Sequence, residues 1–278
     1  MTENSLYATP KNIIDINLCY FYHTMDIPGY GMVHGEWDLR TGFREYLGGV
    51  NLHGKRVLEL GTASGFLCFK MEQMGAEVVA HDLSEQQSWD IVPYYNIDHR
   101  QALLERKSHI QKLNNGYWFA HQAFKSNAKV LYCSIYEIPE QLGMVDISTF
   151  GSILLHVRDP FLALHKALAL TKDTVIVTDV APAFYRLTRF ANRMLFQKNL
   201  FSRFVKPYME FLPNFRKCEP TETWWHITPD LIAQFIGILG FEDIQCHYHK
   251  QLFQGREILL YTVVGRRTKE TPLFNTRG

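Results

Sequence analysis

The sequence predicts an α/β fold in which a mainly parallel sheet is covered by helices on both faces. Two observations indicate it. From residue 54 onward, short apolar strand-like segments alternate with helical segments, and the chain closes with two long strand-like segments typical of an antiparallel hairpin. With 278 residues, of which 46% are hydrophobic, the chain also has enough apolar side chains for a sizeable core.

Each expected strand is an apolar run that ends at a turn or at a polar residue. The seven strands are expected within residues 56–60, 77–84, 129–139, 144–157, 173–180, 241–252 and 256–267. Helices are expected over residues 65–75, most of 85–128, from Pro160 onward, and over 228–241. We expect Gly75 and Gly240 to end two of these helices, because glycine accepts the left-handed backbone of a C-terminal cap.

The chain divides into three parts. Residues 1–53 form a lead segment that could fold over a pocket as a lid. Residues 54–267 form the α/β domain, which carries a basic and aromatic insertion at about residues 181–226. Residues 268–278 form a tail.

Composition narrows the class of protein. The formal charge of +1 gives no global field that would attract nucleic acid. The five cysteines are scattered, which suits reduced thiols better than a disulfide framework. The sequence contains no signal peptide and no apolar run near the ~20 residues of a membrane span, so we expect a cytoplasmic protein.

His247 and His249 alternate on one strand, but no further ligand accompanies them, and we expect no metal site.

The turn after the first strand of the domain indicates a cofactor. Gly61 and Gly65 frame the turn, and Ala63 stands where a dinucleotide-binding turn has a glycine that lets the backbone approach a pyrophosphate. S-adenosylmethionine has no pyrophosphate. Glu59 adds an acid suited to an α-ammonium group, and Asp82 ends the second strand, where a ribose is bound. The turn therefore favours S-adenosylmethionine over a nicotinamide dinucleotide.

Longer motifs carry a resemblance to a known family. The pieces are "YHTMDIPGYG" and "EWDLR" in the lead segment, "VLELGTASGFLCFKMEQMGAEVVAHDL", "GSILLHVRDP" and "TWWHITPDLIAQFIGILGF". Over about residues 54–266 the chain resembles class I S-adenosylmethionine-dependent methyltransferases. More narrowly, it is similar to the group of tRNA wobble-uridine (5-oxyacetate pathway) methyltransferases. The resemblance implies a Rossmann-like, mainly parallel seven-stranded sheet with an antiparallel C-terminal strand.

The resemblance also implies which residues surround the cofactor. Gly61, Ala63 and Gly65 would line its methionine half, and Asp82 and Leu83 would hold its ribose. Ser134 and Ile135 would border its adenine. Gly151 would lie beside its sulfonium, and Trp37 and Arg40 would close the front of the pocket. One position departs from the pattern. The branch that transfers a carboxymethyl group has a tyrosine before the histidine that corresponds to His156, and this chain has Leu155. We therefore expect transfer of a methyl group.

Residues that could act on the acceptor are harder to identify. His156 follows the fourth strand and is the candidate general base, although a histidine at this position more often fixes the strand-to-helix turn. Tyr22 and His23 could contact the acceptor from the lead segment, and Trp224 and Trp225 could form its wall, but all four could instead be packed core residues.

The stretch 184–217 bears on the acceptor as well. It carries eight Lys or Arg residues and one Glu, a local charge of +7. Such a segment could form a helical cover over a pocket, grip RNA phosphates, lie on an anionic membrane, or be a solvated helix face. We expect a methyltransferase for an oxygen or nitrogen of a small molecule. The alternatives are a tRNA-modifying methyltransferase, a non-catalytic cofactor-binding protein and a nicotinamide oxidoreductase.

Overall fold

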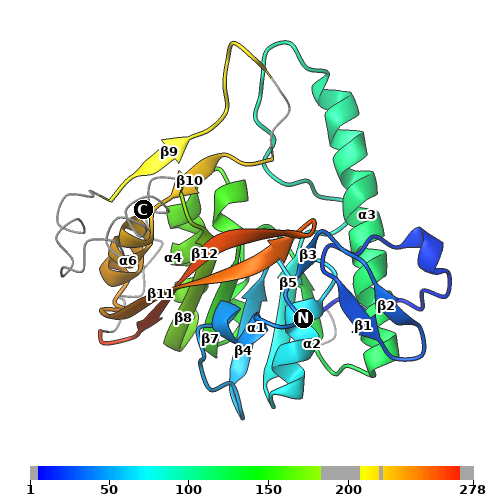
Figure 1. The fold of residues 1–278 in the computed structure, drawn as a ribbon, viewed down its shortest axis with the longest axis horizontal. Helices are drawn as coiled ribbons and strands as arrows, with labels where there is room; N and C mark the ends of the chain where they lie inside the picture. The colour runs from blue at the N-terminus through cyan, green and yellow to red at the C-terminus, as the bar shows by residue number, and fades with distance from the viewer. Residues whose placement is uncertain (1–5, 183–206, 219–221, 270–278) are drawn as a thin grey trace.

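The computed structural model describes residues 6–182, 207–218 and 222–269. Eight strands form the central sheet in the order β3-β11-β12-β8-β7-β4-β5-β6 (Figure 1). Their bounds are Trp37–Asp38 (β3), Arg56–Leu60 (β4), Glu77–Asp82 (β5), Lys129–Tyr132 (β6), Val145–Gly151 (β7), Thr171–Val180 (β8), Asp243–Phe253 (β11) and Arg256–Arg266 (β12).

The strand directions confirm the predicted fold class. Strands β4 to β8 pair in parallel, whereas β12 pairs antiparallel with both β8 and β11. The last strand is thus inserted between β8 and β11, as the resemblance to class I methyltransferases implies. The lead segment adds one strand to the seven expected, because β3 pairs with the end of β11 through Leu252 and Phe253.

Helices cover both faces of the sheet, as expected. Helices α4 (Pro160–Leu168) and α6 (Pro229–Ile238) pack on one face, and α2 (Phe66–Gln73) and α3 (His99–Phe124) pack on the other (Figure 1). A short helix α1 (Phe43–Tyr46) lies in the lead segment. Among the described residues, no helix combines the length and the apolar character that crossing a membrane requires.

Two smaller pairs of strands lie outside the central sheet. They are β1 (Met25–Ile27) with β2 (Gly31–Val33), and β9 (Met209–Phe211) with β10 (Trp225–Ile227). A small cluster of buried side chains joins the region before α3 to the region around β10; it comprises Val92, Tyr94, Cys218 and Trp224. These regions lie together at the top of the molecule in Figure 1.

The expected helices over 65–75, from Pro160 and over 228–241 are confirmed, and two other expectations are corrected. Residues 85–98 are turns and extended backbone, because Pro93 interrupts the segment and α3 begins only after Asp98, whose carboxylate accepts from the backbone N–H of Arg100 and Gln101. Residues 207–217 are not helical either, since they contain β9. The rest of the expected helical cover, 184–206, lies outside the described residues.

Candidate functional site

The glycine turn after β4 has a backbone that only a few residue types adopt readily. Gly61, Ala63 and Gly65 all have positive φ, at 78°, 52° and 88°. Glycine takes such angles without strain, whereas alanine does so at a cost. The turn then leads directly into the N-terminus of α2. It presents backbone with almost no side chain at the carboxyl edge of the sheet, where ligands of open α/β folds bind.

Asp82 links this turn to the end of β5 by a hydrogen bond. Its Oδ2 accepts a hydrogen bond of 2.8 Å from the backbone N–H of Ala63, and its Oδ1 accepts one of 2.8 Å from that of Leu83. Burial raises the pKa of the carboxyl, against the opposing effect of these two bonds. Each oxygen retains a lone pair, so the carboxylate can still accept hydrogen bonds from a ligand.

A cavity of about 210 Å³ lies beside this turn at the carboxyl ends of β4, β5, β6 and β7. Nine of the predicted site residues line it: Tyr22, Gly61, Ala63, Asp82, Leu83, Ser134, Ile135, Gly151 and His156. Seven others are not among its described lining residues: His23, Trp37, Arg40, Glu59, Gly65, Trp224 and Trp225. The structure therefore gathers seven of the eleven predicted cofactor residues around one cavity, although these seven come from four separate segments of the chain.

Glu59 lies beneath the turn. Its side chain is 3% exposed, and its Oε2 accepts a 2.7 Å hydrogen bond from the hydroxyl of Thr62. Burial raises the pKa of Glu59 to about 8, with a smaller contribution from the nearby charge of Asp82 and an opposing one from Thr62. A buried carboxyl of this kind is stabilised by a cation close to it.

The lead segment is attached to the turn by a serine that the sequence analysis did not single out. The hydroxyl of Ser64 accepts a 3.1 Å hydrogen bond from the backbone N–H of Tyr22, which lines the cavity. His23 lies next to it, 7% exposed, and burial lowers its pKa to about 4. The bond explains how a segment more than 40 residues away in sequence reaches the cavity wall.

Trp37 and Arg40 lie further from the cavity. The indole N–H of Trp37 donates a 3.2 Å hydrogen bond to the hydroxyl of Tyr22, so Trp37 supports a lining residue. The guanidinium of Arg40 forms ion pairs with Asp38 at 2.8 Å and with Asp26 at 3.2 Å. In this structure its charge is directed to these two carboxylates.

His156 lines the cavity with a defined orientation. Its Nδ1 is 2.8 Å from the backbone carbonyl of Glu222. Because a carbonyl only accepts, Nδ1 carries the proton and Nε2 carries the lone pair. Burial, and then the charge of Arg106, lower the pKa of His156 to about 4. The ring is therefore neutral near pH 7 and is a weak base, which favours a positioning role.

Trp224 and Trp225 support the rim of the cavity. The indole N–H of Trp224 donates to the carbonyl of Asp90 at 3.2 Å, and that of Trp225 donates to the carbonyl of Val157 at 3.0 Å. The carboxylate of Asp90 also accepts from the backbone N–H of Arg158 at 2.7 Å. Asp90 thus joins three segments around the opening. Sequence reasoning missed it because the loop that carries it was expected to be helical.

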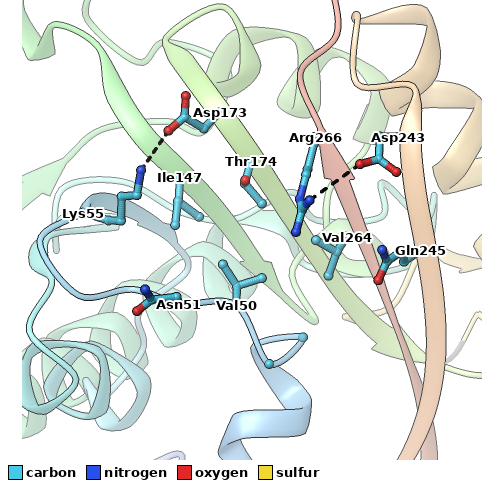
Figure 2. Close-up of a pocket in the computed structure, with 12 residues that line it drawn as sticks. Val50, Asn51, Lys55, Ile147, Asp173, Thr174, Asp243, Gln245, Val264 and Arg266 are labelled. Atoms are coloured by element: carbon cyan, nitrogen blue, oxygen red, sulfur yellow. Dashed lines mark hydrogen bonds and ion pairs between the residues drawn. The ribbon is translucent and has the colours of Figure 1, made fainter.

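A second, larger hollow of about 460 Å³ lies at the amino ends of β4, β7 and β8 (Figure 2). Lys55 pairs with Asp173 at 3.1 Å, and Arg266 pairs with Asp243 at 3.8 Å. None of the predicted site residues lines it. Groups of three or more potential metal ligands do not occur in the described part of the chain.

Comparisons with known proteins gave matches among solved structures alone. No family model and no curated protein matches the chain. Among solved structures, the chain is similar to magnesium protoporphyrin IX methyltransferase from Synechocystis with bound S-adenosylhomocysteine (16% identity, 83% of this chain and 85% of that chain, TM-score 0.47). It is also similar to Burkholderia thailandensis 1,6-didemethyltoxoflavin N1-methyltransferase (13% identity, 81% and 75%, TM-score 0.43).

A third similar structure is an S-adenosylmethionine-dependent methyltransferase from Methanosarcina mazei (13% identity, 81% of this chain and 96% of that chain, TM-score 0.46). At such identities the likeness is one of fold alone. The comparisons give no support to the narrower resemblance to the tRNA wobble-uridine group.

Proposed function

We propose that the protein transfers a methyl group from S-adenosylmethionine to an oxygen or nitrogen of a small-molecule acceptor. The observation that carries this proposal is the arrangement of the glycine turn, Asp82 and the cavity at the carboxyl edge of the sheet. The backbone N–H of Ala63 and the carboxylate of Asp82 meet at 2.8 Å beside a cavity floored by Gly61 and Gly151. Backbone without bulky side chains here leaves space for a ligand of nucleoside size.

The residues present fit this cofactor. Asp82 offers free lone pairs to two ribose hydroxyls, and Leu83 and Ile135 provide apolar walls for a flat base. A methyl carbon added at Gly61 would stand 3.1 Å from Ile153, so a side chain at this position would take up room in the cavity. The buried carboxyl of Glu59 suits a positively charged amino-acid moiety, reached through Thr62 or by displacing its hydroxyl.

When bound, S-adenosylmethionine supplies a methyl group on a good leaving group, so the protein chiefly has to align the acceptor and exclude water. His156, fixed by Glu222, would shape the acceptor side of the cavity. Tyr22, fixed by Ser64 and Trp37, would close it from the lead segment. Ordinary methyl transfer is favoured over carboxymethyl transfer because Leu155 stands before His156 and offers no hydroxyl to a carboxylated donor.

The other functions remain testable alternatives. A nicotinamide oxidoreductase is disfavoured by Ala63, whose side chain occupies the position that a pyrophosphate approaches. A tRNA substrate would use the basic stretch, and Arg186, Arg189 and Arg193 of that stretch lie outside the described residues. Salt dependence separates RNA from a pocket ligand, because RNA binding releases counterions and weakens steeply as salt rises.

The experiment that tests the proposal is a labelling screen. In two separate reactions, the purified protein is incubated with S-adenosylmethionine labelled at its methyl group. One reaction contains a metabolite extract and the other contains total tRNA. We expect label to appear in a small molecule and not in tRNA. Label in tRNA would favour the alternative, and label in neither would support a non-catalytic binding protein. A His156→Gln variant serves as a comparison, and we expect it to keep part of the activity, because the histidine is a weak base.

A further inference from the structure

One wall of the cavity is a loop without a helix or strand of its own. This wall loop covers residues 84–97, between β5 and α3, and its residues Ser88, Trp89 and Asp90 line the cavity. Among the described residues, no backbone–backbone hydrogen bond joins the wall loop to another part of the chain. Of its three lining residues, only Asp90 forms hydrogen bonds with another described segment. Side chains therefore hold the wall loop in place.

Other parts of the cavity wall are held by the backbone itself. The backbone N–H of Gly61 donates to the carbonyl of His81 at 2.9 Å, which ties the glycine turn to β5. In the lead segment, the backbone N–H of Trp37 donates to the carbonyl of Tyr22 at 3.1 Å. The wall loop lacks such bonds to its surroundings, so it is the part of the wall that can move with the least disruption of backbone hydrogen bonds.

The cavity is small for the ligands that the proposed function requires. Its volume is about 210 Å³. Pockets for small molecules and cofactors usually measure about 300–1,000 Å³, and this one would have to hold a cofactor and an acceptor together. Part of the wall therefore has to move outward when both are bound.

Asp90 ties the middle of the wall loop to three other segments. Its Oδ2 accepts a hydrogen bond from the hydroxyl of Tyr136 and another, of 2.7 Å, from the backbone N–H of Arg158. Its backbone carbonyl accepts a hydrogen bond of 3.2 Å from the indole N–H of Trp224. Hydrogen bonds to a carboxylate are stronger than those between neutral groups. The carboxylate of Asp90 is thus the strongest attachment of the lining part of the loop.

Tyr136 is held in position to donate to this carboxylate. It lines the cavity, and its hydroxyl accepts a 3.1 Å hydrogen bond from the backbone N–H of Asp159. Burial first, and then the hydrogen bond with Asp90, raise the pKa of Tyr136. The hydroxyl therefore keeps its proton near pH 7 and remains a donor.

The two ends of the wall loop have attachments of their own. Near its start, Glu85 forms a 2.9 Å ion pair with a lysine of the lead segment. Near its end, the hydroxyl of Tyr94 accepts a 3.1 Å hydrogen bond from the backbone N–H of Asn214. Between them, the ring of Trp89 lies 4.8 Å from the guanidinium of Arg106, a weaker contact than a hydrogen bond to a carboxylate. The ends can therefore stay in place while the middle of the loop moves.

We propose that Asp90 is a positioning residue that latches the wall loop over the cavity, and that this latch has to open when ligands enter and leave. The inference rests on the proposed methyl transfer, in which S-adenosylhomocysteine is the product that has to leave. Loop opening sets the rate of product release in many enzymes. Because the latched loop blocks the same opening in both directions, it slows entry and exit to a similar degree.

The binding kinetics of S-adenosylhomocysteine test the latch. Surface plasmon resonance gives the association and dissociation rates for the wild type, Asp90→Asn and Tyr136→Phe. Asparagine keeps the size of Asp90 but loses the charge, so we expect both rates to rise about tenfold while the dissociation constant stays within about twofold. Tyr136→Phe removes one of the two bonds to the carboxylate, and we expect both rates to rise about threefold.

Asp98→Asn is the matched control. It makes the same exchange immediately after the wall loop, at a residue that does not line the cavity. The side chain of Asp98 accepts hydrogen bonds from the backbone N–H groups of Arg100 and Gln101 at the start of α3. Asparagine caps a helix about as well as aspartate does, so we expect both rates to stay as in the wild type.

The two rates separate a latch from a residue that only stabilises the ligand or the fold. Loss of a ligand contact would raise the dissociation rate alone and weaken the affinity. That result would overturn the latch, as would unchanged rates in Asp90→Asn or an equal acceleration in Asp98→Asn.

Proteolysis keeps the latch and the proposed function apart. A wild type that does not bind S-adenosylhomocysteine would refute the proposed function, but chymotrypsin would still report on the wall loop. Cleavage after Trp89, followed by mass spectrometry, requires this half-buried residue to leave the wall. We expect Tyr136→Phe, which leaves the sequence of the loop unchanged, to be cleaved there faster than the wild type. Equal cleavage rates would overturn the latch whatever the binding result.

Discussion

The two hollows at opposite ends of the sheet differ in the state of their polar groups. The hollow at the amino ends is the larger, about 460 Å³ against about 210 Å³ for the cavity at the carboxyl ends. Its charged side chains are paired and half in solvent: Lys55 and Asp173 are 40% and 50% exposed. At the carboxyl ends, Glu59 and Asp179 are 3% and 2% exposed and neither has a cationic partner in the described residues.

The reason for the difference lies in the chain direction. In a parallel sheet every strand reaches the carboxyl edge just before a turn or loop, so polar residues at strand ends converge there. Asp82, Gly151 and Asp179 come from three such strand ends. At the amino edge, Lys55, which precedes β4, forms an ion pair with Asp173 of β8, and β7 lies between these two strands. Among the described residues, buried carboxyl groups without a cationic partner distinguish the carboxyl end of the sheet from the hollow at its amino end.

The largest expected effect concerns the pH dependence of stability. The pKa of Asp179 is raised from 3.8 to about 7 in the folded protein. The folded state then holds a proton that the unfolded chain has released, so the wild type loses stability as pH rises from about 4 to about 7. Asp179→Asn lacks this loss. We expect its stability relative to the wild type to increase by up to about 4 kcal/mol over that window, at about 1.4 kcal/mol per pKa unit.

Urea unfolding at several pH values measures this difference. The matched control is Asp173→Asn, on the same strand but at the half-exposed end, and its stability relative to the wild type should change by less than about 1 kcal/mol. Equal pH profiles for the two variants would contradict the contrast between the two ends of the sheet.

The second effect compares two glycines. Gly65 has a φ of +88°, and a methyl carbon there would lie 2.6 Å from Phe69 and 2.8 Å from Tyr117. Gly49, at the larger hollow, has a φ of +65° but no described atom within 4 Å of that position. We expect Gly65→Ala to lower the free energy of unfolding by about 3 kcal/mol, and Gly49→Ala by about 1 kcal/mol, since only backbone strain applies there. Denaturant titration checks both, and equal losses would count against the tight turn.

The third effect concerns Glu59 and the cofactor. With a pKa raised to about 8, its carboxyl group is mostly protonated at pH 7. A cofactor with an α-ammonium group favours the ionised form, so binding should release a proton below pH 8. We expect the affinity for S-adenosylhomocysteine to rise with pH by at most about tenfold per unit and to level off above pH 8. Calorimetry in buffers of different ionisation enthalpy detects the proton, and Glu59→Gln should abolish its release.

The smallest effect belongs to the amino-end ion pair. Lys55→Ala removes a pair whose two side chains are 40% and 50% exposed. Exposed ion pairs contribute little to stability, so we expect a marginal loss in the free energy of unfolding and unchanged cofactor affinity. A loss of affinity upon this change would show that the larger hollow takes part in binding.

Much of the fold could be predicted because its signals are local. Alternating apolar runs, Gly75 and Gly240 beyond helix ends, and Pro160 at a helix start depend on a few neighbouring residues. The loop over 85–98 was misread because its residues pack against the distant Trp224 instead of following a helical period of their own. The extra strand β3 has only two residues, too few for a periodic pattern.

The position of Gly61 and Asp82 at strand ends beside the cavity was also predictable from the strand pattern, whereas Gly151 came from the family resemblance. Two features around the cavity were not predictable. Ser64 acts through a bond across 42 positions to Tyr22. Asp179 reads in the sequence as an ordinary residue of an apolar strand, and only its burial and its unpaired oxygen set it apart. Such properties arise from tertiary packing, which no local pattern records.

Calorimetric titration with S-adenosylhomocysteine tests the central claim most directly. The wild type should bind it, NAD should give no heat of binding, and Asp82→Ala should lose about 1.5–3 kcal/mol of binding free energy, the range for hydrogen bonds to a charged group. Asp173→Ala, at the opposite end of the sheet, should bind as the wild type does. Binding of NAD in place of S-adenosylhomocysteine, or an Asp82→Ala variant with undiminished affinity, would contradict the account.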